Sequence, residues 1–364
     1  MADGAGPEHP DQVRPRRLAG LRALLAKVRD PVIILPYLGY GTRELLALSG
    51  RVLQDEGFRP ARDAERRCRN LVAFFKRMES DEVPGALLRA RFGNATAEAK
   101  SDRQGYFSLR MNARAQPGWN DVALELVREP RIRALGRVLV PSPEARFGVV
   151  SDIDDTIVYS NVLSKWRMVL SLALSNARTR KPFAGVAAFY RALHRGVNPV
   201  FYVSKSPWNL YAPLVEYLEV QRLPLGPLVL RDFGLRMDKE HKTRAIDALL
   251  RTYPALPFLL IGDSGERDPE IYADIVRRHP QRIRAIYIRS VDRRPQRLRA
   301  LEALISQVAP TGCQLVLAPD SEFAAAHAAA AGLIAPGELA AVRADRGADA
   351  RASASPRRAP AEPP

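Results

Sequence analysis

The chain has 364 residues and a formal net charge of +16, so it exceeds one typical domain, and two domains and an anionic partner are expected. No run of about 18 apolar residues occurs, which excludes a hydrophobic spanning helix, and two distant cysteines, Cys68 and Cys313, exclude a disulfide framework. Because Arg22 and Lys27 interrupt the first apolar stretch, no secretory signal is expected, and a cytoplasmic protein, or one peripheral to a membrane, is predicted.

The first thirty residues divide into a polar start and a short basic helix. Residues 1–13 are polar with scattered Pro and Gly and are predicted to be disordered. Residues 14–29 have apolar side chains at helical spacing, with Arg and Lys on the other face. Such a helix suits either an anionic membrane surface or the flank of the following domain, and we favour the flank.

Residues 31–141 are predicted to form a small, mostly antiparallel β-sandwich. Most of its segments alternate: Phe107 and Leu109 point to one side while Ser108 and Arg110 point to the other. The expected strands cover residues 32–35, 45–53, 86–92, 106–111, 122–127 and 137–140. A helix at 61–78 is expected to interrupt them.

Residues 142–308 alternate between strands and helices, which predicts an α/β domain with a parallel sheet and helices on both faces. The expected strands cover residues 148–150, 200–203, 228–230, 258–261 and 283–288. A last strand and helices are expected within 309–345, followed by a disordered tail at 346–364.

The first of these strands ends in Asp152, Asp154 and Thr156, preceded by an apolar run. Burying unpaired carboxylates is costly, so packing alone does not explain this acidic strand end. Oxygen ligands two residues apart suit Mg²⁺. A calcium-binding EF-hand loop is excluded, because Ile157 and Leu163 occupy the positions that need Gly and an acidic residue. A helix cap or a solvated loop remains the alternative for this segment alone.

Three more strand ends carry polar side chains, and ligands of such sheets bind beyond the carboxyl ends of the strands. Ser204 follows the second strand, Lys242 opens the helix after the third, and Asp263 and Asp268 lie in the turn after the fourth. Taken one at a time, Ser204 would be interpreted as a helix cap, Lys242 as a surface lysine, and the two aspartates as part of an ordinary turn. Together they supply a hydroxyl, a cation and a second acidic group beside the first strand end, which predicts a phosphoryl-transfer site.

At these residues the sequence resembles the haloacid-dehalogenase superfamily of phosphotransferases. More narrowly, it resembles the phosphatidate phosphatase family first named from an actin-patch protein. The motifs that carry the resemblance lie at residues 151–157, 202–211, 241–242 and 261–272, within a segment of about 147–292. Lys205 departs from the family pattern, which more often has a small or neutral polar residue there.

The resemblance implies a haloacid-dehalogenase-like Rossmannoid sheet and Mg²⁺-dependent hydrolysis of phosphatidate to diacylglycerol and phosphate. It implies that Asp152 is the nucleophile and forms an aspartyl-phosphate, that Asp154 is the acid and base, and that Lys242 offsets charge. The implied phosphate-binding residues are Thr156, Ser204 and Lys242, and the implied metal ligands are Asp152, Asp154, Asp263 and Asp268.

Residues 159–189 form an apolar insertion at the place where the superfamily has caps. Trp166 and its basic neighbours suit a lid that meets lipid headgroups, and an ordinary packed helix is the alternative. Two other functions stay open: a phosphatase for a soluble phosphomonoester or phosphoprotein, and a catalytically weak phosphate- or membrane-binding module. No nucleic-acid partner is expected, because no helix-turn-helix, zinc-finger or RNP pattern occurs.

Overall fold

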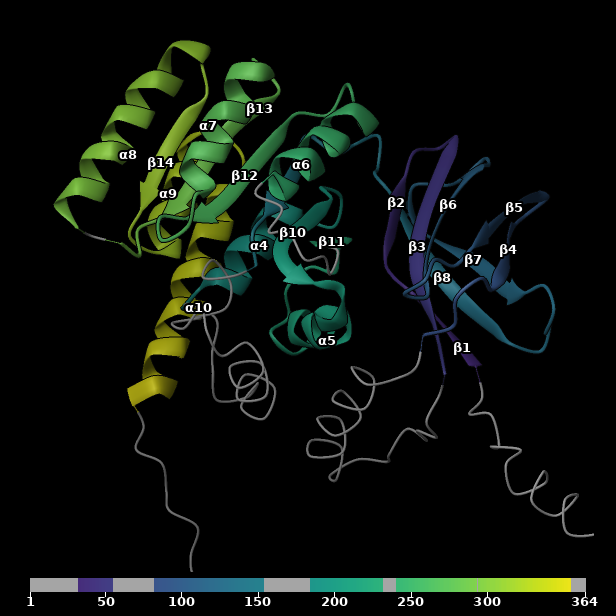
Figure 1. The fold of residues 1–364 in the computed structure, drawn as a ribbon. Coiled ribbons are helices and arrows are strands. Elements are labelled where there is room, and N and C mark those ends of the chain that lie inside the picture. The colour runs from purple at the N-terminus through teal and green to yellow at the C-terminus, as the bar shows by residue number, and fades with distance from the viewer. Residues whose placement is uncertain (1–31, 55–81, 154–183, 232–239, 293, 355–364) are drawn as a thin grey trace, which may run out of the picture.

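The structure is a computed structural model that describes residues 32–54, 82–153, 184–231, 240–292 and 294–354 (Figure 1). Several predicted features lie outside these residues. They are the disordered start at 1–13, the helices at 14–29 and 61–78, Asp154, Thr156 and most of the 159–189 insertion.

The N-terminal strands form one sheet that is antiparallel except where β2 pairs with β8. Its strands are β1 (Val32–Pro36), β2 (Gly39–Gly41), β3 (Leu45–Gln54), β4 (Leu87–Phe92), β5 (Ala95–Lys100), β6 (Tyr106–Asn112), β7 (Gly118–Leu126) and β8 (Arg133–Val140). Strand β5 ends the strand order, β6 pairs with β3 near its other end, and β5 and β6 contact each other, so the sheet curls around one apolar core. Strands β2 and β5 had not been predicted, because β2 is short and glycine-rich and β5 is mostly Ala and charged residues.

The second sheet is entirely parallel, as predicted. Its strands are β9 (Gly148–Ser151), β10 (Val200–Pro207), β11 (Leu228–Arg231), β12 (Phe258–Asp263), β13 (Ile283–Arg289) and β14 (Gln314–Ala318). They lie in the order β11-β10-β9-β12-β13-β14. The chain therefore runs outward from β9 in one direction and then returns beside β9 to run outward in the other, which places a switch point between β9 and β12.

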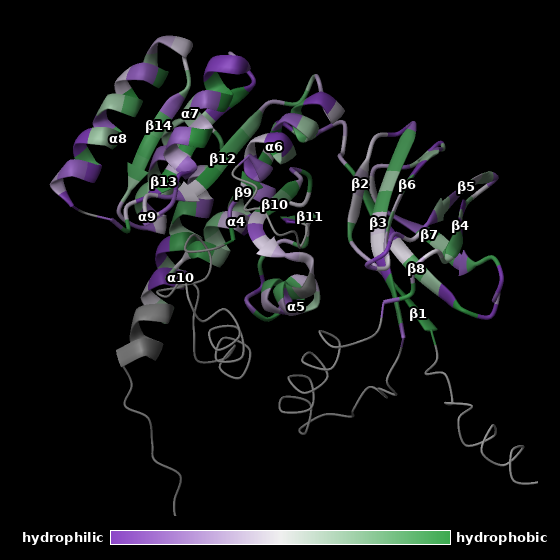
Figure 2. Cartoon of the chain, in the orientation of Figure 1, coloured by the Kyte–Doolittle hydropathy of each residue, from purple (hydrophilic) through white to green (hydrophobic). Residues whose placement is uncertain are grey.

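Helices cover both faces of the parallel sheet, and each face has its own apolar core. One face packs against α4 (Val186–His194), α5 (Tyr211–Val220), α9 (Ser321–Ala330) and α10 (Pro336–Ala354). The other face packs against α6 (His241–Thr252), α7 (Asp268–Arg278) and α8 (Pro295–Val308). Figure 2 shows the hydrophobic residues concentrated on the strands between these two helical layers. The prediction of a mixed α/β fold is thus confirmed.

Two predicted boundaries are wrong. Helix α10 continues to Ala354, whereas the tail was predicted to be disordered from residue 346. Ala and Arg are strong helix formers, and Arg343 and Arg346 tie α10 to α9 by pairing with Glu322 and Asp320 at 2.8 and 3.0 Å. The predicted insertion also extends too far, because its last residues, from Val186 onward, are buried in the first turns of α4.

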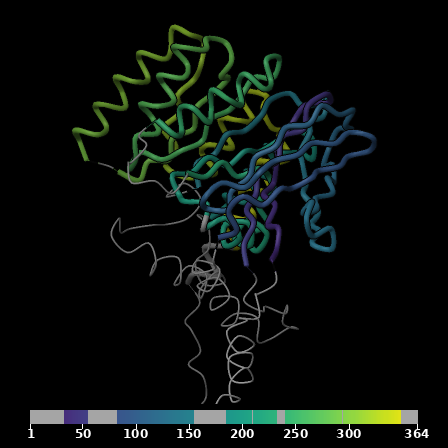
Figure 3. Tube along the Cα trace, turned by 45° about the vertical axis from the view of Figure 1, so that its right-hand side comes forward, coloured from purple at the N-terminus to yellow at the C-terminus, as the bar shows by residue number. Residues whose placement is uncertain are grey.

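The two sheets contact each other directly. Figure 3 shows the strands of the N-terminal sheet beside those of the parallel sheet. Tyr37, between β1 and β2, stacks on Trp208 after β10, and Tyr253, after α6, donates a hydrogen bond to Gly41 in β2. The N-terminal sheet is therefore packed beside the part of the parallel sheet that carries Ser204.

Glycines mark places where backbones of this fold approach closely, and they allow a stability test. A Cβ on Gly226, just before β11, would lie 1.9 Å from the Val200 carbonyl oxygen, whereas a Cβ on Gly337 in α10 would meet nothing within 4 Å. We expect Gly226→Ala to cost about 1–3 kcal/mol, and Gly337→Ala to be neutral or to stabilise by up to about 1 kcal/mol. Urea denaturation followed by circular dichroism measures both, and equal midpoints would contradict the expectation.

Candidate active site

The candidate site lies at the switch point of the parallel sheet, where ligands of such folds bind. Asp152 directly follows β9 and Asp263 ends β12, and these two strands are neighbours. Both side chains are fully buried. The Asp152 amide donates to the Ile261 carbonyl oxygen at 2.9 Å, which continues the strand pairing up to the acidic residue. The fold therefore brings two carboxylates from distant parts of the sequence to one edge.

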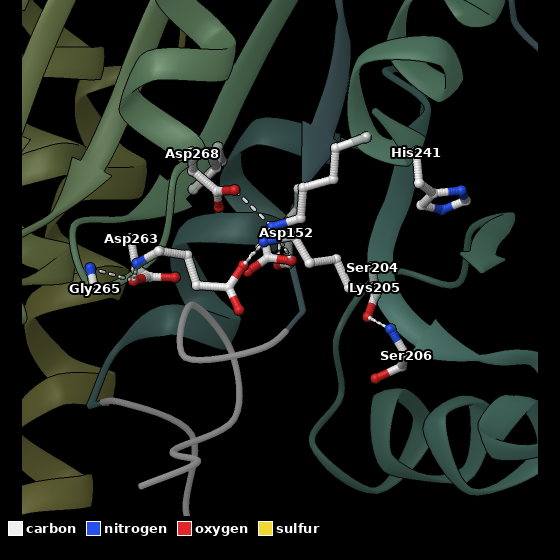
Figure 4. Close-up of polar contacts among 12 residues, drawn as sticks. Asp152, Ser204, Lys205, Ser206, His241, Asp263, Gly265 and Asp268 are labelled. Carbon is white, nitrogen blue, oxygen red and sulfur yellow. Dashed lines mark hydrogen bonds and ion pairs between the residues drawn. The ribbon is translucent and has the colours of Figure 1, made fainter. Parts of the chain in front are cut away.

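The centre of the site is the ammonium of Lys242, in the first turn of α6, which is 2 % exposed. Its Nζ lies 2.9 Å from Asp152 Oδ1, 2.6 Å from Asp268 Oδ1 and 3.3 Å from Glu266 Oε2 (Figure 4). Burial by itself would lower the pKa of Lys242, but Asp152 and Asp268 hold it well above its usual value. Lys242 follows β11 and contacts acidic residues after β9 and β12, so its charge links three of the four strand ends.

The turn after β12 holds Asp263 through its backbone. Asp263 Oδ1 accepts hydrogen bonds from the amides of Gly265 and Glu266 at 2.6 and 3.1 Å. Burial and the nearby charge of Asp268 raise the pKa of Asp263 to about 7, although the two amides and Lys242 oppose the shift. A Cβ on Gly262 would lie 2.5 Å from Asp268 Oδ2, so a glycine is needed there for the Asp268 carboxylate to reach its position.

Ser204 is fully buried near the end of β10, and its Oγ accepts a hydrogen bond from the Ser206 amide at 2.9 Å. The neighbouring Lys205 points to the acidic turn, with its Nζ 2.7 Å from Glu266 Oε2 and its side chain 32 % exposed. Glu266 therefore lies between two ammonium groups. Burial alone would raise its pKa, but Lys242 and Lys205 lower it below the usual value.

The structure brings most of the predicted site residues to one edge. Lys242 contacts Asp152 and Asp268 directly, and Asp263 and Ser204 end the strands on either side of β9. Asp154 and Thr156 lie outside the described residues.

Sequence reasoning missed two residues of the site. Glu266 had no predicted role, although its place in the acidic turn was a usable signal. Arg297 in α8 donates to the carbonyl oxygens of Ser264 and Glu266 at 2.8 and 2.7 Å, and it pairs with Glu270. No local sequence pattern connects Arg297 to that turn, so only the fold reveals its contribution.

The carboxylates suit a hard divalent cation. Ligand atoms of Asp152, Glu266 and Asp268 lie within 4.8 Å of one another, but the Lys242 ammonium already contacts all three. Asp263 Oδ2 and Asp268 Oδ2 are buried and accept no hydrogen bond from the part of the chain that the structure describes. Because a buried carboxylate oxygen without a donor is costly, and an all-oxygen set is what Mg²⁺ prefers, these residues fit a metal site.

The fold and the site define an α/β protein whose parallel sheet carries a buried lysine among carboxylates at its switch point. Residues 147–290 match the model of the family described as "Phosphatidate phosphatase APP1, catalytic domain". The match of this segment confirms the family resemblance found in the sequence.

Two yeast proteins match part of the chain. The chain is 32 % identical over 147 residues to phosphatidate phosphatase APP1 of Saccharomyces cerevisiae, and 29 % identical over 145 residues to an uncharacterised protein of Schizosaccharomyces pombe. Each match covers 38 % of this chain, and the chain spans only 25 % and 24 % of the two relatives.

Among solved structures, phosphoserine phosphatase from T. onnurineus aligns with a TM-score of 0.29 at 13 % identity, covering 51 % of this chain and 96 % of that one. A likeness this small carries no argument about the site.

The buried lysine predicts a strong and pH-dependent effect on stability. Lys242→Met leaves Asp152 and Asp268 buried without their cation, so we expect a loss of about 3–5 kcal/mol at pH 7.5. The loss should shrink toward pH 5, because protonation removes the uncompensated negative charges. Urea denaturation at both pH values measures it. Lys205→Met is the matched control and should cost at most about 1 kcal/mol, since its ion pair is partly solvated. Equal losses for the two variants would contradict this account.

Proposed function

We propose that the chain is a Mg²⁺-dependent phosphatase of phosphomonoesters, with phosphatidate as substrate and an aspartyl-phosphate intermediate. The observation that carries the proposal is the Lys242 ammonium, held 2.9 Å from Asp152 Oδ1 at the switch point of the sheet. The match of residues 147–290 to the phosphatidate phosphatase APP1 catalytic family supports the substrate. The strand order, with its acidic residue after β9, supports the haloacid-dehalogenase-like arrangement.

In the proposed first step, a carboxylate oxygen of Asp152 forms a bond to phosphorus while the bond from phosphorus to the substrate alkoxide breaks. Asp154 gives its proton to the departing alkoxide. In the second step Asp154 takes a proton from water, the water oxygen attacks phosphorus, and Asp152 and inorganic phosphate are released. Proton transfer of this kind typically contributes roughly 10²- to 10⁴-fold.

The remaining residues act on charge and orientation. Lys242 contacts the nucleophile and so lies where the phosphoryl oxygens would arrive, while Ser204 and Thr156 would donate hydrogen bonds to them. Bound Mg²⁺ would offset the repulsion between the nucleophile and the phosphate. Asp152, the Asp154 carbonyl and Asp263 would hold it, and Asp268 would orient its waters or Lys242.

We further propose five parts of the chain: a start and basic helix at 1–30, a sandwich-like domain at 31–141, a catalytic domain at 142–308, C-terminal elements at 309–354 and a tail after α10. None of the described helices is both long and apolar enough to cross a bilayer. A cytoplasmic chain that touches an anionic membrane from one side would reach phosphatidate, and the net charge of +16 supports such contact.

Removing the nucleophile tests the chemistry. Asp152→Asn should lower phosphate release from phosphatidate vesicles in Mg²⁺ by roughly 10³-fold or more, because an amide does not form the covalent intermediate. Asp121→Asn is the control, since Asp121 is an exposed residue of β7 in the other sheet. Sugar phosphates and nucleotides assayed beside phosphatidate separate the lipid from soluble substrates. Metal-dependent phosphate release retained by Asp152→Asn would exclude Asp152 as the nucleophile.

The acidic turn gives a test that needs no turnover. Asp263 has a folded-state pKa of about 7, above its usual value, so its charge opposes folding of the metal-free protein increasingly as pH rises from about 4 to 7. Asp263→Asn keeps an acceptor for the Gly265 and Glu266 amides and removes that charge. We therefore expect it to stabilise the metal-free protein at pH 8, by up to roughly 4 kcal/mol, and much less at pH 5.

The same variant reports on metal binding. Adding Mg²⁺ should raise the thermal midpoint of the wild type, because the ion binds the folded state, and should raise that of Asp263→Asn little. Differential scanning fluorimetry with and without EDTA measures both midpoints. A Mg²⁺-induced shift of equal size in the two proteins would remove Asp263 from the set of metal ligands.

A further inference from the structure

The strand that carries Ser204 loses its regular pairing where the site begins. Strand β10 pairs with β9 only as far as Tyr202, and its pairing with β11 is interrupted between Val203 and Pro207. Pro207 has no amide proton to donate to a ladder. Residues 204–207, the last residues of β10 and here named the phosphate-binding turn, therefore lie where the register of the sheet is irregular.

Residues 37–41 of the N-terminal sheet, here named the positioning segment, pack directly behind this turn. The Tyr37 ring stacks on the Trp208 ring, with centroids 4.5 Å apart and planes 8° apart, and it also contacts the Tyr211 ring at 4.3 Å. The Leu38 amide donates a hydrogen bond to the Tyr211 hydroxyl at 2.6 Å. Trp208 directly follows Pro207, so these contacts hold the C-terminal end of the turn in place.

The other end of the positioning segment contacts β10 before the turn and the residue that follows α6. The Tyr40 ring meets the edge of Phe201 in β10, with centroids 5.9 Å apart. The Tyr253 hydroxyl donates to the Gly41 carbonyl oxygen at 3.1 Å, and Tyr253 directly follows α6, whose first turn holds Lys242. The segment thus contacts both sides of the turn and the helix that presents the ammonium.

The positioning segment is itself held firmly. Tyr37 is 4 % exposed, and burial raises its pKa far above the usual value for tyrosine, so its hydroxyl stays neutral. A Cβ on Gly39 would lie 2.2 Å from the Ala47 carbonyl oxygen, which shows how closely the segment lies against β3. Buried aromatic pairs add attraction beyond the burial of area. A rigid sheet therefore supports the turn from outside the catalytic segment.

We propose that the N-terminal sheet sets the position of the phosphate-binding turn, with Tyr37 as a positioning residue that touches no substrate. The inference rests on the proposed function, because the turn must bind phosphoryl oxygens. Without the Tyr37 ring, Trp208 loses its stacking partner and the turn carrying Ser204 shifts. Misplacement of a substrate-binding group by about 1 Å can cost on the order of 10²-fold.

The test uses the full chain with Mg²⁺ and vesicles of phosphatidylcholine containing phosphatidate. Tyr37→Ala should raise KM about tenfold and weaken competitive inhibition by inorganic phosphate by a similar factor, with kcat changed less than about threefold. Tyr37→Phe keeps the stacked ring and should restore both constants. Val122→Ala, in the core of the same sheet, should lower the thermal midpoint and leave KM unchanged.

Tyr211→Phe supplies a milder variant that keeps every ring but removes the acceptor of the Leu38 amide, and a rise in KM of about twofold to threefold is expected. It carries the test if Tyr37→Ala fails to fold. Wild-type KM in both variants would overturn the positioning role, and so would an equal rise in KM for Val122→Ala. A wild-type protein that releases no phosphate from any phosphomonoester would overturn the proposed function itself.

Discussion

The burial of the Lys242 ammonium among carboxylates is the interaction on which the rest of this site depends. Asp152 and Asp268 are fully buried, and their charges are tolerable only because Lys242 lies 2.9 and 2.6 Å away. A structural protein would have little reason to gather these charges at the end of an apolar sheet, since well-packed hydrophobic residues are commonly as stable. The arrangement therefore supports the proposed chemistry, in which a phosphoryl group and a metal ion would share these charges.

The Lys242 ammonium alone does not neutralise the carboxylates at this edge of the parallel sheet. Asp263 relies on two backbone amides, and buried oxygens of Asp263 and Asp268 accept no hydrogen bond within the described ranges. The turn that presents them is tied by Arg297 from α8, a residue that lies after the matched segment 147–290. The chain thus holds its acidic residues in a geometry that a cation would stabilise, and it uses elements outside the family segment to do so.

The N-terminal sheet likewise supports the side of the site that carries Ser204, from outside the matched segment. Its described strands supply no side chain to the acidic cluster, yet Tyr37 stacks on Trp208 beside the turn of Ser204, and Gly41 accepts a hydrogen bond from Tyr253 at the C-terminal end of α6. The pairing of β10 is irregular at the proposed phosphate-binding turn, so contacts from outside the parallel sheet support this part of the strand. Packing an aromatic cluster against a second, curled sheet provides that support without placing further charge near the nucleophile.

The mixed α/β class, the strands that lead to Asp152, Ser204 and Asp263, and the family resemblance of residues 147–290 could all be predicted from the sequence, because apolar runs, turn residues and motif spacing are local properties. The folded chain was needed to show that Lys242 contacts both Asp152 and Asp268, that Glu266 lies between two lysines, and that Arg297 and Tyr37 contact the elements around the site. The extent of α10 also depended on its packing and ion pairs with α9. Such contacts join residues far apart in the chain, and their energies come from burial and charge pairing, which no local pattern encodes.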